Sequence, residues 1–244
     1  MANRNKLQKF AELATFSNVY ENFNPLQPKL TAAGGHLVDL RGSWRSEHFK
    51  NDHPLTLELA CGRGEYTVEL ARRYPHRNFI GVDVKGARIW RGAKDALAEG
   101  LDNAAFLRGR IEPIASFFEP GEVDEIWITF PDPFRKKGKA NRRLTAAGFL
   151  REYRKILKPG GIIHLKTDSQ LLYNWTLAYF AHQAAVEVLY HDNDIYSKPL
   201  PQPELDIQTY YERMHRDLGE PITYIRFRLH EDIPFDFSRG LVEE

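Results

Sequence analysis

Residues 55–84, LTLELACGRGEYTVELARRYPHRNFIGVDV, decide the fold of this 244-residue chain. The apolar run 55–60 is typical of a strand. The glycine turn after it leads into a helix predicted over 65–74, which stops near Pro75. A second apolar run, 78–84, predicts a second strand. Strand, helix and strand in this order predict a parallel sheet that is covered by helices on both faces.

The same alternation continues along the chain. We expect further strands at 103–109, 123–130 and 162–168, and further helices at 86–100 and 144–157. The last of these helices places its large apolar residues on one face, which predicts that this face packs on the core: Phe149, Leu150, Tyr153, Ile156 and Leu157. The fold is therefore predicted to be α/β, with a mostly parallel sheet.

Both ends of this pattern are irregular. The polar, proline-rich segment 191–206 predicts a surface loop, and 222–229 predicts an antiparallel edge strand after a short helix. Residues 1–50 show no clear periodicity, and Arg4, Lys6 and Lys9 make their start basic. We therefore treat 1–50 as an N-terminal extension and a candidate RNA-contacting segment.

Composition sets the broad class. The apolar share of 42% is ordinary for a globular protein, and a single cysteine excludes an intramolecular disulfide. No segment resembles a signal peptide or a membrane span, so we expect a soluble, cytoplasmic protein without a membrane partner. The net charge of +1 says little about partners, because a local field depends on where charges gather.

The residues that follow the strands are the candidate ligand site, because ligands in such folds bind beyond the carboxyl ends of the strands. Gly62 and Gly64 allow a tight turn and close approach of a ligand to a helix N-terminus. The Asp83 carboxylate could accept hydrogen bonds from ribose hydroxyls, and the Glu58 carboxylate could pair with a cationic amino group. S-adenosylmethionine carries a ribose and an amino-acid group of this kind. A dinucleotide enzyme would need glycine where Thr67 stands, and two glycines that merely turn the chain are the simpler alternative.

A second candidate site is FPDPFRKKGKANRR, residues 130–143. Pro131 and Pro133 end the strand and stiffen the chain around Asp132, which places a carboxylate beside the predicted ligand pocket. A surface turn followed by a solvated charge run is the simpler alternative. The basic residues that follow suit RNA phosphates: Arg135, Lys136, Lys137, Lys139, Arg142 and Arg143.

These motifs resemble those of the tRNA (guanine-N7)-methyltransferases over about residues 55–229. FPDPFRKKGKANRRL (130–144), KPGGIIHLKTD (158–168) and TYYE (209–212) occur in the order typical of that family. The resemblance implies a Rossmann-like class I methyltransferase domain over 51–244. It also implies methyl transfer from S-adenosylmethionine to N7 of a guanine in tRNA, in the variable loop.

The resemblance also implies roles for single residues. It assigns the cofactor site to Glu58, Gly62, Gly64, Asp83, Arg110 and Asp132. It assigns substrate contacts to Lys136, Asp168, Thr209, Tyr210, Tyr211 and Glu212, and RNA contacts to Arg135, Lys137, Lys139, Arg142 and Arg143. Two departures stand out: Ala60 replaces a usual glycine, and Arg110 replaces a usual acid that would meet the adenine amino group. A backbone group or Glu112 is a candidate replacement for that acid.

Guanine N7 carries a lone pair and no proton, so its methylation needs positioning rather than a general base. We expect no metal, because no His/Cys cluster has metal spacing. Asp132 is the first candidate to grip the guanine NH groups, and Asp168 is the second. Helix capping is the alternative for Asp168, and a capping box is the alternative for Thr209 and Glu212.

Three other functions stay open. A methyltransferase of exocyclic amines would carry Asp/Asn-Pro-Pro-aromatic, an order that Pro131–Phe134 does not have. Thr67 opposes a dehydrogenase. An RNA-binding protein with a degenerate cofactor pocket would fit Ala60 and Arg110. We expect tRNA as the partner and no obligatory protein partner, and the chain as a monomer or homodimer.

Overall fold

A computed structural model of the chain describes residues 6–22, 24 and 27–237, so Arg4 lies outside the described residues. The strands are β1 (Val19–Glu21), β2 (Leu30–Thr31), β3 (Leu37–Val38), β4 (Leu55–Leu59), β5 (Asn78–Asp83), β6 (Ala104–Arg108), β7 (Val123–Thr129), β8 (Leu157–Thr167), β9 (Val186–Asp192) and β10 (Thr223–Leu229). The α-helices are α1 (Lys6–Leu13), α2 (Glu65–Arg73), α3 (Gly86–Ala98), α4 (Ala147–Ile156), α5 (Gln170–Phe180) and α6 (Tyr210–Asp217). Shorter helical segments are η1 (Ala33–Gly35), η2 (Trp44–Phe49), η3 (Ile114–Ser116), η4 (Lys137–Arg142) and η5 (Pro203–Asp206).

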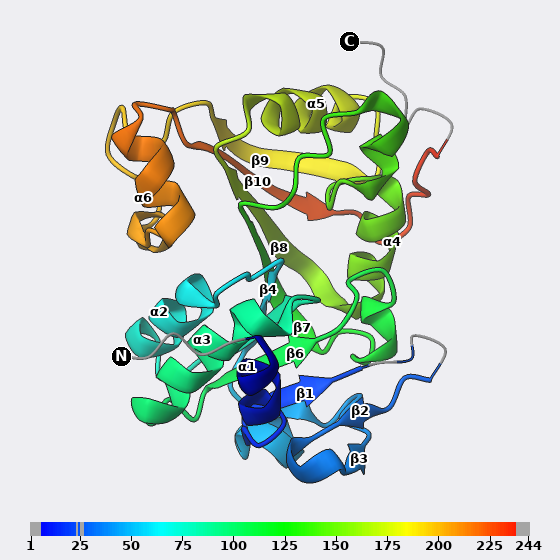
Figure 1. Cartoon of the computed structure of the whole chain (residues 1–244). Coiled ribbons are helices and arrows are strands. Elements are labelled where there is room, and N and C mark those ends of the chain that lie inside the picture. Colours follow the sequence, from blue (N-terminus) through cyan, green and yellow to red (C-terminus); the bar gives the residue numbers. More distant parts are fainter. Residues whose placement is uncertain (1–5, 23, 25–26, 238–244) are drawn as a thin grey trace.

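The strands of this part of the chain form one sheet in the order β3-β2-β1-β6-β5-β4-β7-β8-β10-β9 (Figure 1). The strands from β6 through β5, β4 and β7 to β8 pair in parallel, which confirms the predicted parallel core. Glu58 in β4 lies beside Gly81 of β5 and Trp127 of β7. The carboxyl ends of these three strands therefore meet at one edge of the sheet.

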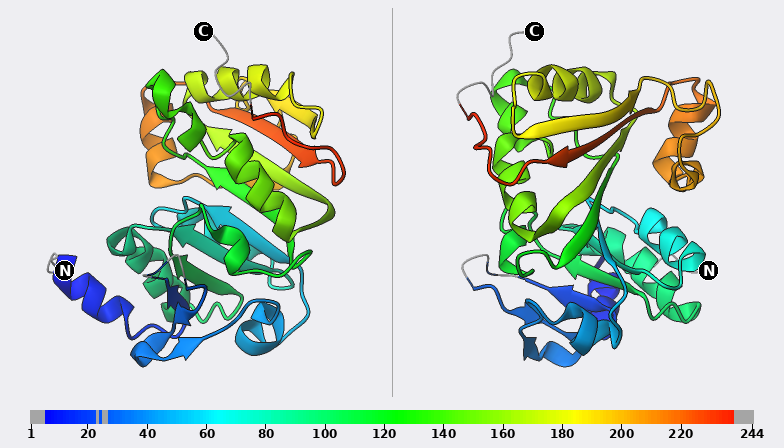
Figure 2. Two further views of the ribbon diagram at one scale, coloured as in Figure 1. Left: turned by 90° about the vertical axis from the view of Figure 1, so that its right-hand side faces the viewer. Right: turned by 180° about the vertical axis from the view of Figure 1, so that it is seen from behind.

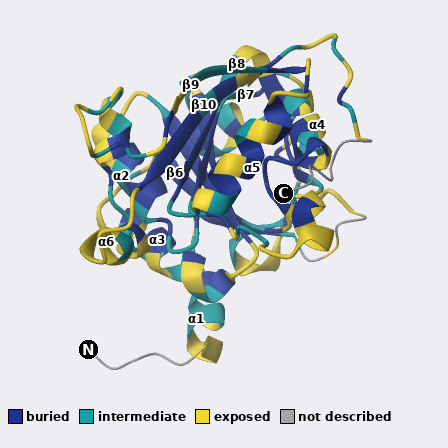
Figure 3. Ribbon diagram, turned by 90° about the horizontal axis from the view of Figure 1, so that it is seen from above, coloured by how far each residue is buried: buried dark blue, intermediate teal, exposed yellow. Residues whose placement is uncertain are grey.

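Helices cover both faces of the sheet, as predicted (Figure 2). One buried cluster joins Trp44 and the apolar faces of α4 and α5, and the other joins α2, α3 and Leu13 of α1. The strands between them are largely buried, whereas the helices expose their outer sides (Figure 3). All five residues of the predicted apolar face are buried, four of them in α4 and the fifth, Leu157, at the start of β8. No helix in the described ranges is both long and apolar enough to cross a membrane.

The segment before residue 50 extends the same sheet. β1 pairs in parallel with β6, β2 and β3 add antiparallel strands, and α1 lies against α3, where Trp90 Nε1 donates to Glu12 Oε2 at 2.8 Å. Sequence periodicity missed these strands because they are only two or three residues long. The division of the chain at residue 50 stays a prediction.

Two predictions near the C-terminus are wrong. Strand β10 is antiparallel, as expected, but it lies between β8 and β9, so β9 is the edge strand. The segment 191–206 is not simply a surface loop: it begins inside β9, and Ile195 and Leu205 are fully buried. These two apolar side chains pack into the core cluster around α2. Their burial holds the segment against the protein although most of its residues are polar.

Candidate active site

The first part of the site is the turn between β4 and α2. Gly62 N–H donates to Asp83 Oδ2 at 3.0 Å, and Lys85 N–H donates to Asp83 Oδ1 at 2.8 Å. The structure thus brings together the glycine turn and the acid at the end of β5, which are 21 residues apart in the chain. The Asp83 carboxylate offers about four acceptor positions, so these two bonds leave capacity for ligand hydroxyls.

The two glycines of the turn differ in what surrounds them. A methyl group added to Gly62 would have only the Ala60 carbonyl oxygen nearby, at 3.9 Å, so there is room beside this backbone. A methyl group added to Gly64 would lie 2.5 Å from a Phe106 ring carbon, and Gly64 has a φ of +70°. Gly64 is therefore required for the start of α2 and its packing, and its contact with a cofactor stays a prediction.

Glu58 is placed differently from the expectation, because its side chain is enclosed between β4, α2 and β7. The residue is 2% exposed. Its Oε2 accepts from the Thr67 N–H at 2.8 Å and from the Thr67 hydroxyl, and its Oε1 accepts from Thr129 Oγ1 at 2.5 Å. In this arrangement Glu58 orders the turn and the end of β7 and has almost no surface for direct contact with a ligand.

Burial raises the pKa of Glu58 to about 7, against the opposing hydrogen bonds from Thr129 and Thr67. An acid with a raised folded pKa binds more protons folded than unfolded between pH 4.5 and 7, so its stabilising contribution falls as pH rises through this window. Glu58→Gln cannot ionise, so its free energy of unfolding should not fall in this way. At pH 8, where Glu58 is largely ionised, the variant should be more stable than wild type by up to about 3 kcal/mol. Denaturant unfolding at pH 4.5, 6 and 8 checks this, with exposed Glu112→Gln as control. A stability gap that is the same at all three pH values would contradict it.

The second part of the site is the Pro-Asp-Pro loop after β7. Phe130 and Phe134, which flank it, both have positive φ angles, 47° and 43°. Such angles are unusual for aromatic residues and cluster at functional sites. Asp132 is exposed, and its Oδ1 accepts from the Phe134 N–H at 3.0 Å. One carboxylate oxygen therefore fixes the loop, which follows the carboxyl end of β7, the strand that pairs with β4.

The basic run divides into exposed and buried members. Five of the predicted contacts are exposed on η4 or beside it, as an RNA interface requires: Arg135, Lys136, Lys137, Lys139 and Arg142. Arg143 is 1% exposed; its Nε donates to Pro133 O at 3.0 Å, its Nη2 donates to Phe134 O at 3.2 Å, and its guanidinium lies 4.6 Å from the Trp175 ring. The prediction that Arg143 contacts RNA is therefore wrong for this arrangement. It supports the Pro-Asp-Pro loop from within.

The third part of the site is the end of β8. Ser169, rather than Asp168, caps α5, because Ser169 Oγ accepts from the Leu172 N–H at 3.2 Å. Asp168 Oδ2 instead lies 3.2 Å from His215 Nε2, and Glu220 contacts the other ring nitrogen of His215. These three side chains place potential ligand atoms within 4.8 Å of one another, so the expectation that the site holds no metal stays a prediction.

Helix α6 carries the TYYE motif. Thr209 caps it, because its hydroxyl accepts from the Glu212 N–H at 3.2 Å, but the Glu212 carboxylate binds Lys166 and Tyr196, so only the threonine half of the capping-box alternative is confirmed. The Glu212 carboxylate is fully buried against Lys166, so the direct substrate contact predicted for it is not available in this structure. Tyr210 and Tyr211 are exposed, and the Arg63 guanidinium lies 4.2 Å from the Tyr210 ring.

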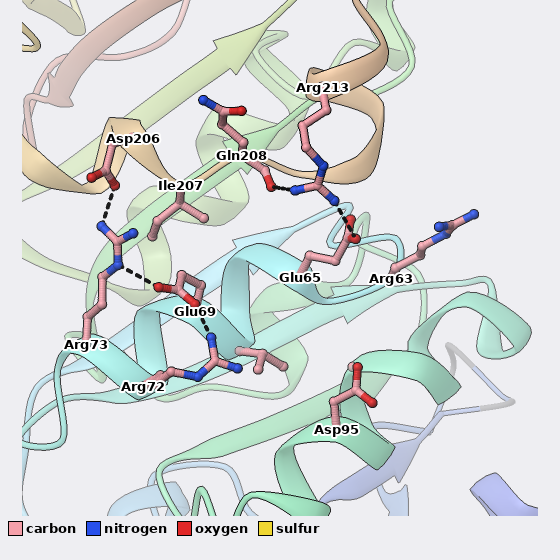
Figure 4. Close-up of a pocket in the computed structure, with 12 residues that line it drawn as sticks. Arg63, Glu65, Glu69, Arg72, Arg73, Asp95, Asp206, Ile207, Gln208 and Arg213 are labelled. Carbon is pink, nitrogen blue, oxygen red and sulfur yellow. Dashed lines mark hydrogen bonds and ion pairs between the residues drawn. The ribbon is translucent and has the colours of Figure 1, made fainter.

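A charged cleft of about 370 Å³ separates α2 from the segment that leads into α6 (Figure 4). Arg73 joins Glu69 of its own helix to Asp206 across the cleft, and Arg213 reaches Glu65 at 3.6 Å. These ion pairs link the two walls. The cleft is therefore a seam that holds α6 beside α2, and Arg63 of the glycine turn is among the residues that line it.

Comparisons with known proteins agree with this geometry. A family model described as "Putative methyltransferase" matches residues 52–225. A tRNA (guanine-N(7)-)-methyltransferase of Christiangramia forsetii is 50% identical over 94% of this chain and 100% of its own length. A protein of the same name from Bacteroides thetaiotaomicron is 47% identical over 94% of this chain and 87% of its own length.

The chain belongs to the tRNA (guanine-N7)-methyltransferase family. Solved structures confirm the fold of this family member. The 16S rRNA methyltransferase KamB superposes with a TM-score of 0.58 at 14% identity, over 80% of this chain and 97% of that one. TrmN from Thermus thermophilus superposes with a TM-score of 0.51 at 21% identity, over 73% of this chain and 45% of that one. The predicted class I methyltransferase fold is thus confirmed.

The structure also shows what the two departures from the usual family pattern do. Ala60, which replaces a glycine, has a φ of +61°, a backbone region that strains any residue with a Cβ. Arg110 is exposed and lies 3.8 Å from Glu112. That ion pair places a carboxylate in the turn after β6, so Glu112 stays the candidate replacement for the usual acid.

Ala60→Gly should stabilise this family member by about 0.5–1 kcal/mol, because relief of the left-handed strain exceeds the extra entropy that glycine gains on unfolding. Urea unfolding measures the change. Ala87→Gly, which makes the same substitution in the first turn of α3, should instead destabilise by up to about 1 kcal/mol. Equal destabilisation by both substitutions would contradict the assignment of strain at Ala60.

Sequence analysis missed several residues that shape the site. Thr129 and Lys166 bind the carboxylates of Glu58 and Glu212, and His215 contacts Asp168. The only available signal was a charged lysine inside an apolar strand, which requires a buried partner. Nothing in the sequence indicated which acid that partner is.

Proposed function

We propose that this protein transfers the methyl group of S-adenosylmethionine to N7 of a guanine in tRNA, in the variable loop. Family membership supports the reaction. The observation that carries the proposal is Asp132, an exposed carboxylate that two prolines and two strained phenylalanines fix at the end of β7, directly before an exposed basic run.

The residues present fit the cofactor. S-adenosylmethionine supplies an activated methyl group on a sulfonium. The free acceptor positions of Asp83 suit ribose hydroxyls, and the open space at Gly62 lets a ligand approach the backbone. Asp132 and the turn that contains Arg110 and Glu112 would complete the pocket. Glu58 would act indirectly, by ordering Thr67 and Thr129.

The chemistry asks the protein for alignment. Guanine N7 has a lone pair and needs no base, so the protein must hold the ring with N7 facing the methyl group. The free Asp132 oxygen would accept from the ring and exocyclic NH groups of guanine. Asp168 is the second carboxylate at this edge of the sheet. Asp132 acts by orientation and electrostatics and takes no proton.

The basic run would hold the RNA backbone on either side of the target base. Its exposed members, Arg135 to Arg142, lie within ten residues of Asp132, so phosphate contacts and base positioning share one loop. Phosphate contacts of this kind set affinity and position but do not read sequence. The carboxylates of Asp132 and Asp168 would then select the base.

Asp83→Ala should weaken binding of S-adenosylmethionine by about 1–3 kcal/mol, or roughly 5- to 150-fold, because hydrogen bonds to a charged group are lost and the Gly62 N–H loses its acceptor. Isothermal titration calorimetry measures this without RNA. Asp102→Ala, an exposed acid in the turn before β6, is the control and should bind as wild type does. Unchanged affinity in Asp83→Ala would place the cofactor elsewhere.

One chain contributes every residue assigned here. We therefore expect the protein to be active as a monomer or homodimer without an obligatory protein partner. Because its proposed substrate is tRNA, we also expect it to be located in the cytoplasm. Light scattering with and without tRNA gives the oligomeric state.

The direct test is to incubate the purified protein with an unmodified tRNA transcript and S-adenosylmethionine labelled in the methyl group, with and without EDTA. The tRNA is then digested, and the labelled nucleoside is identified by mass spectrometry. We expect N7-methylguanosine in both samples. A transcript in which adenine replaces the variable-loop guanine is the matched control and should take up no label.

Other outcomes separate the alternatives. Label on an exocyclic amine would support a different nucleic-acid methyltransferase. Binding of tRNA with no label, and with no heat of cofactor binding, would support an RNA-binding protein with a degenerate pocket. Loss of activity in EDTA would contradict metal independence and make Asp168, His215 and Glu220 the candidate metal ligands.

A further inference from the structure

Lys166 of β8 and Glu212 of α6 form an ion pair in which both side chains are completely buried. Lys166 Nζ lies 2.8 Å from Glu212 Oε1 and 2.9 Å from Oε2. The same Nζ donates to the carbonyl oxygens of Leu205 and Ile207, both at 2.8 Å. Its three protons are thereby used, and Tyr196 OH donates to Glu212 Oε1 at 2.7 Å.

This pair fastens α6 to the sheet. Lys166 lies in a strand whose carboxyl end carries Asp168, two residues later. Glu212 lies in the first turn of a short helix that is exposed along most of its length. Removal of one partner would leave a buried charge without compensation, so the contact strongly favours the docked position of α6.

The docked helix touches both halves of the proposed active site. At its start, the Tyr210 N–H donates to Glu65 Oε2 at 2.8 Å, and the exposed rings of Tyr210 and Tyr211 lie beside Arg63 of the glycine turn. One turn after Glu212, His215 lies against Asp168. In Figure 1, α6 accordingly stands beside the sheet, above α2 and α3.

We infer that Glu212 is a positioning residue: through Lys166 it locks α6, and the locked helix fixes Asp168 by way of His215 and holds the exposed tyrosines beside the cofactor turn. The inference rests on the proposed function, since it concerns how that site is held. It differs from the direct contact implied by the TYYE resemblance, because the Glu212 carboxylate has no exposed surface.

The test uses three variants of the full chain. Glu212→Gln keeps the shape and removes one charge. Lys166→Met/Glu212→Gln removes both charges together, keeps an amide oxygen that can accept from Tyr196, and leaves the carbonyl oxygens of Leu205 and Ile207 without the Lys166 donor. Asp217→Asn, an exposed acid in the last turn of α6, is the matched control. Each is measured by amide hydrogen exchange over residues 210–217 and by single-turnover methylation at saturating tRNA and S-adenosylmethionine.

In Glu212→Gln we expect amide exchange in α6 to rise at least tenfold while the central strands stay protected, and the single-turnover rate to fall at least tenfold. In the double variant no unpaired charge is left but two carbonyl oxygens lose their donor, so we expect the two quantities to stay coupled: faster amide exchange in α6 accompanies slower turnover. Asp217→Asn should match wild type in both.

Loss of turnover in Glu212→Gln with α6 still protected would overturn the inference, since it would indicate direct contact with substrate. A folded double variant in which α6 exchanges as in wild type while turnover is lost, or in which α6 exchanges faster while turnover is normal, would overturn it too, and this arm decides if Glu212→Gln does not fold. Absence of N7-methylguanosine in the wild-type reaction would instead count against the proposed function, and the exchange measurement does not depend on that reaction.

Discussion

Asp132→Asn is expected to lower the single-turnover rate of tRNA methylation by roughly 10²–10³-fold while the protein stays folded and bound to tRNA. In the structure, Asp132 Oδ1 accepts from the Phe134 N–H at 3.0 Å. The amide oxygen of asparagine can keep that bond, so the loop retains its shape. The other oxygen becomes an NH₂ group, which would oppose the guanine NH groups instead of accepting from them.

The size of the effect follows from how tightly the loop is held. A shift of about 1 Å at a reacting centre can cost about 10²-fold in rate, and Pro131, Pro133 and the strained Phe130 and Phe134 leave Asp132 little freedom to compensate. Rapid-quench assays at saturating tRNA measure the rate, and thermal unfolding verifies the fold. Asp102→Asn, an exposed acid in the turn before β6, is the control. A near-normal rate in Asp132→Asn would refute the role and make Asp168 the leading candidate.

Arg143→Ala is expected to reduce the free energy of unfolding by about 2–4 kcal/mol and to reduce turnover with it. The substitution leaves the partly buried carbonyl oxygens of Pro133 and Phe134 without the Arg143 donor and removes the guanidinium from the Trp175 ring. The Pro-Asp-Pro loop would lose its internal support. Urea unfolding gives the stability, and assays at 15 °C separate loop disorder from global unfolding.

Arg142→Ala is the matched comparison, because Arg142 is adjacent in sequence but exposed. Its loss should change stability by less than about 0.5 kcal/mol. It should lower tRNA affinity for most sequences alike and flatten the log-log salt dependence by up to about one unit. If the neighbouring arginines behaved alike in both assays, the division between a buried support and an RNA contact would be wrong.

Local sequence patterns predicted the central fold because strand and helix periodicity is a property of near neighbours. The strands β4 to β8, helices α2 to α4 and the apolar face of α4 were predicted in this way. The strands β1 to β3 are too short to show a hydrophobic periodicity. Strand β9 was not predicted, because it runs into a polar, proline-rich segment. The inner position of β10 depends on β9, so an error at one strand produced an error at the next.

For the site, the sequence indicated where to look but not which atoms are available. The turn at Gly62, Asp83 and Asp132 were predicted from their places after strands, and the structure gathers them at one edge. Whether a predicted side chain faces solvent could not be predicted, because exposure depends on what packs over it. Glu58 and Arg143 show this, since each looked like a ligand contact and each is enclosed by protein.

The sequence by itself determined the parallel core, the edge at which the site lies, the rigid Pro-Asp-Pro loop and the family, because these depend on periodicity, turn chemistry and motif order. Tertiary structure alone decided which charged side chains are buried and paired inside the protein. Glu58 binds Thr129 across 71 residues, Lys166 binds Glu212 across 46, and Arg143 lies on Trp175. A buried charge must be satisfied by whichever partner the fold brings within about 3 Å, and that partner is set by packing between distant segments rather than by neighbouring residues.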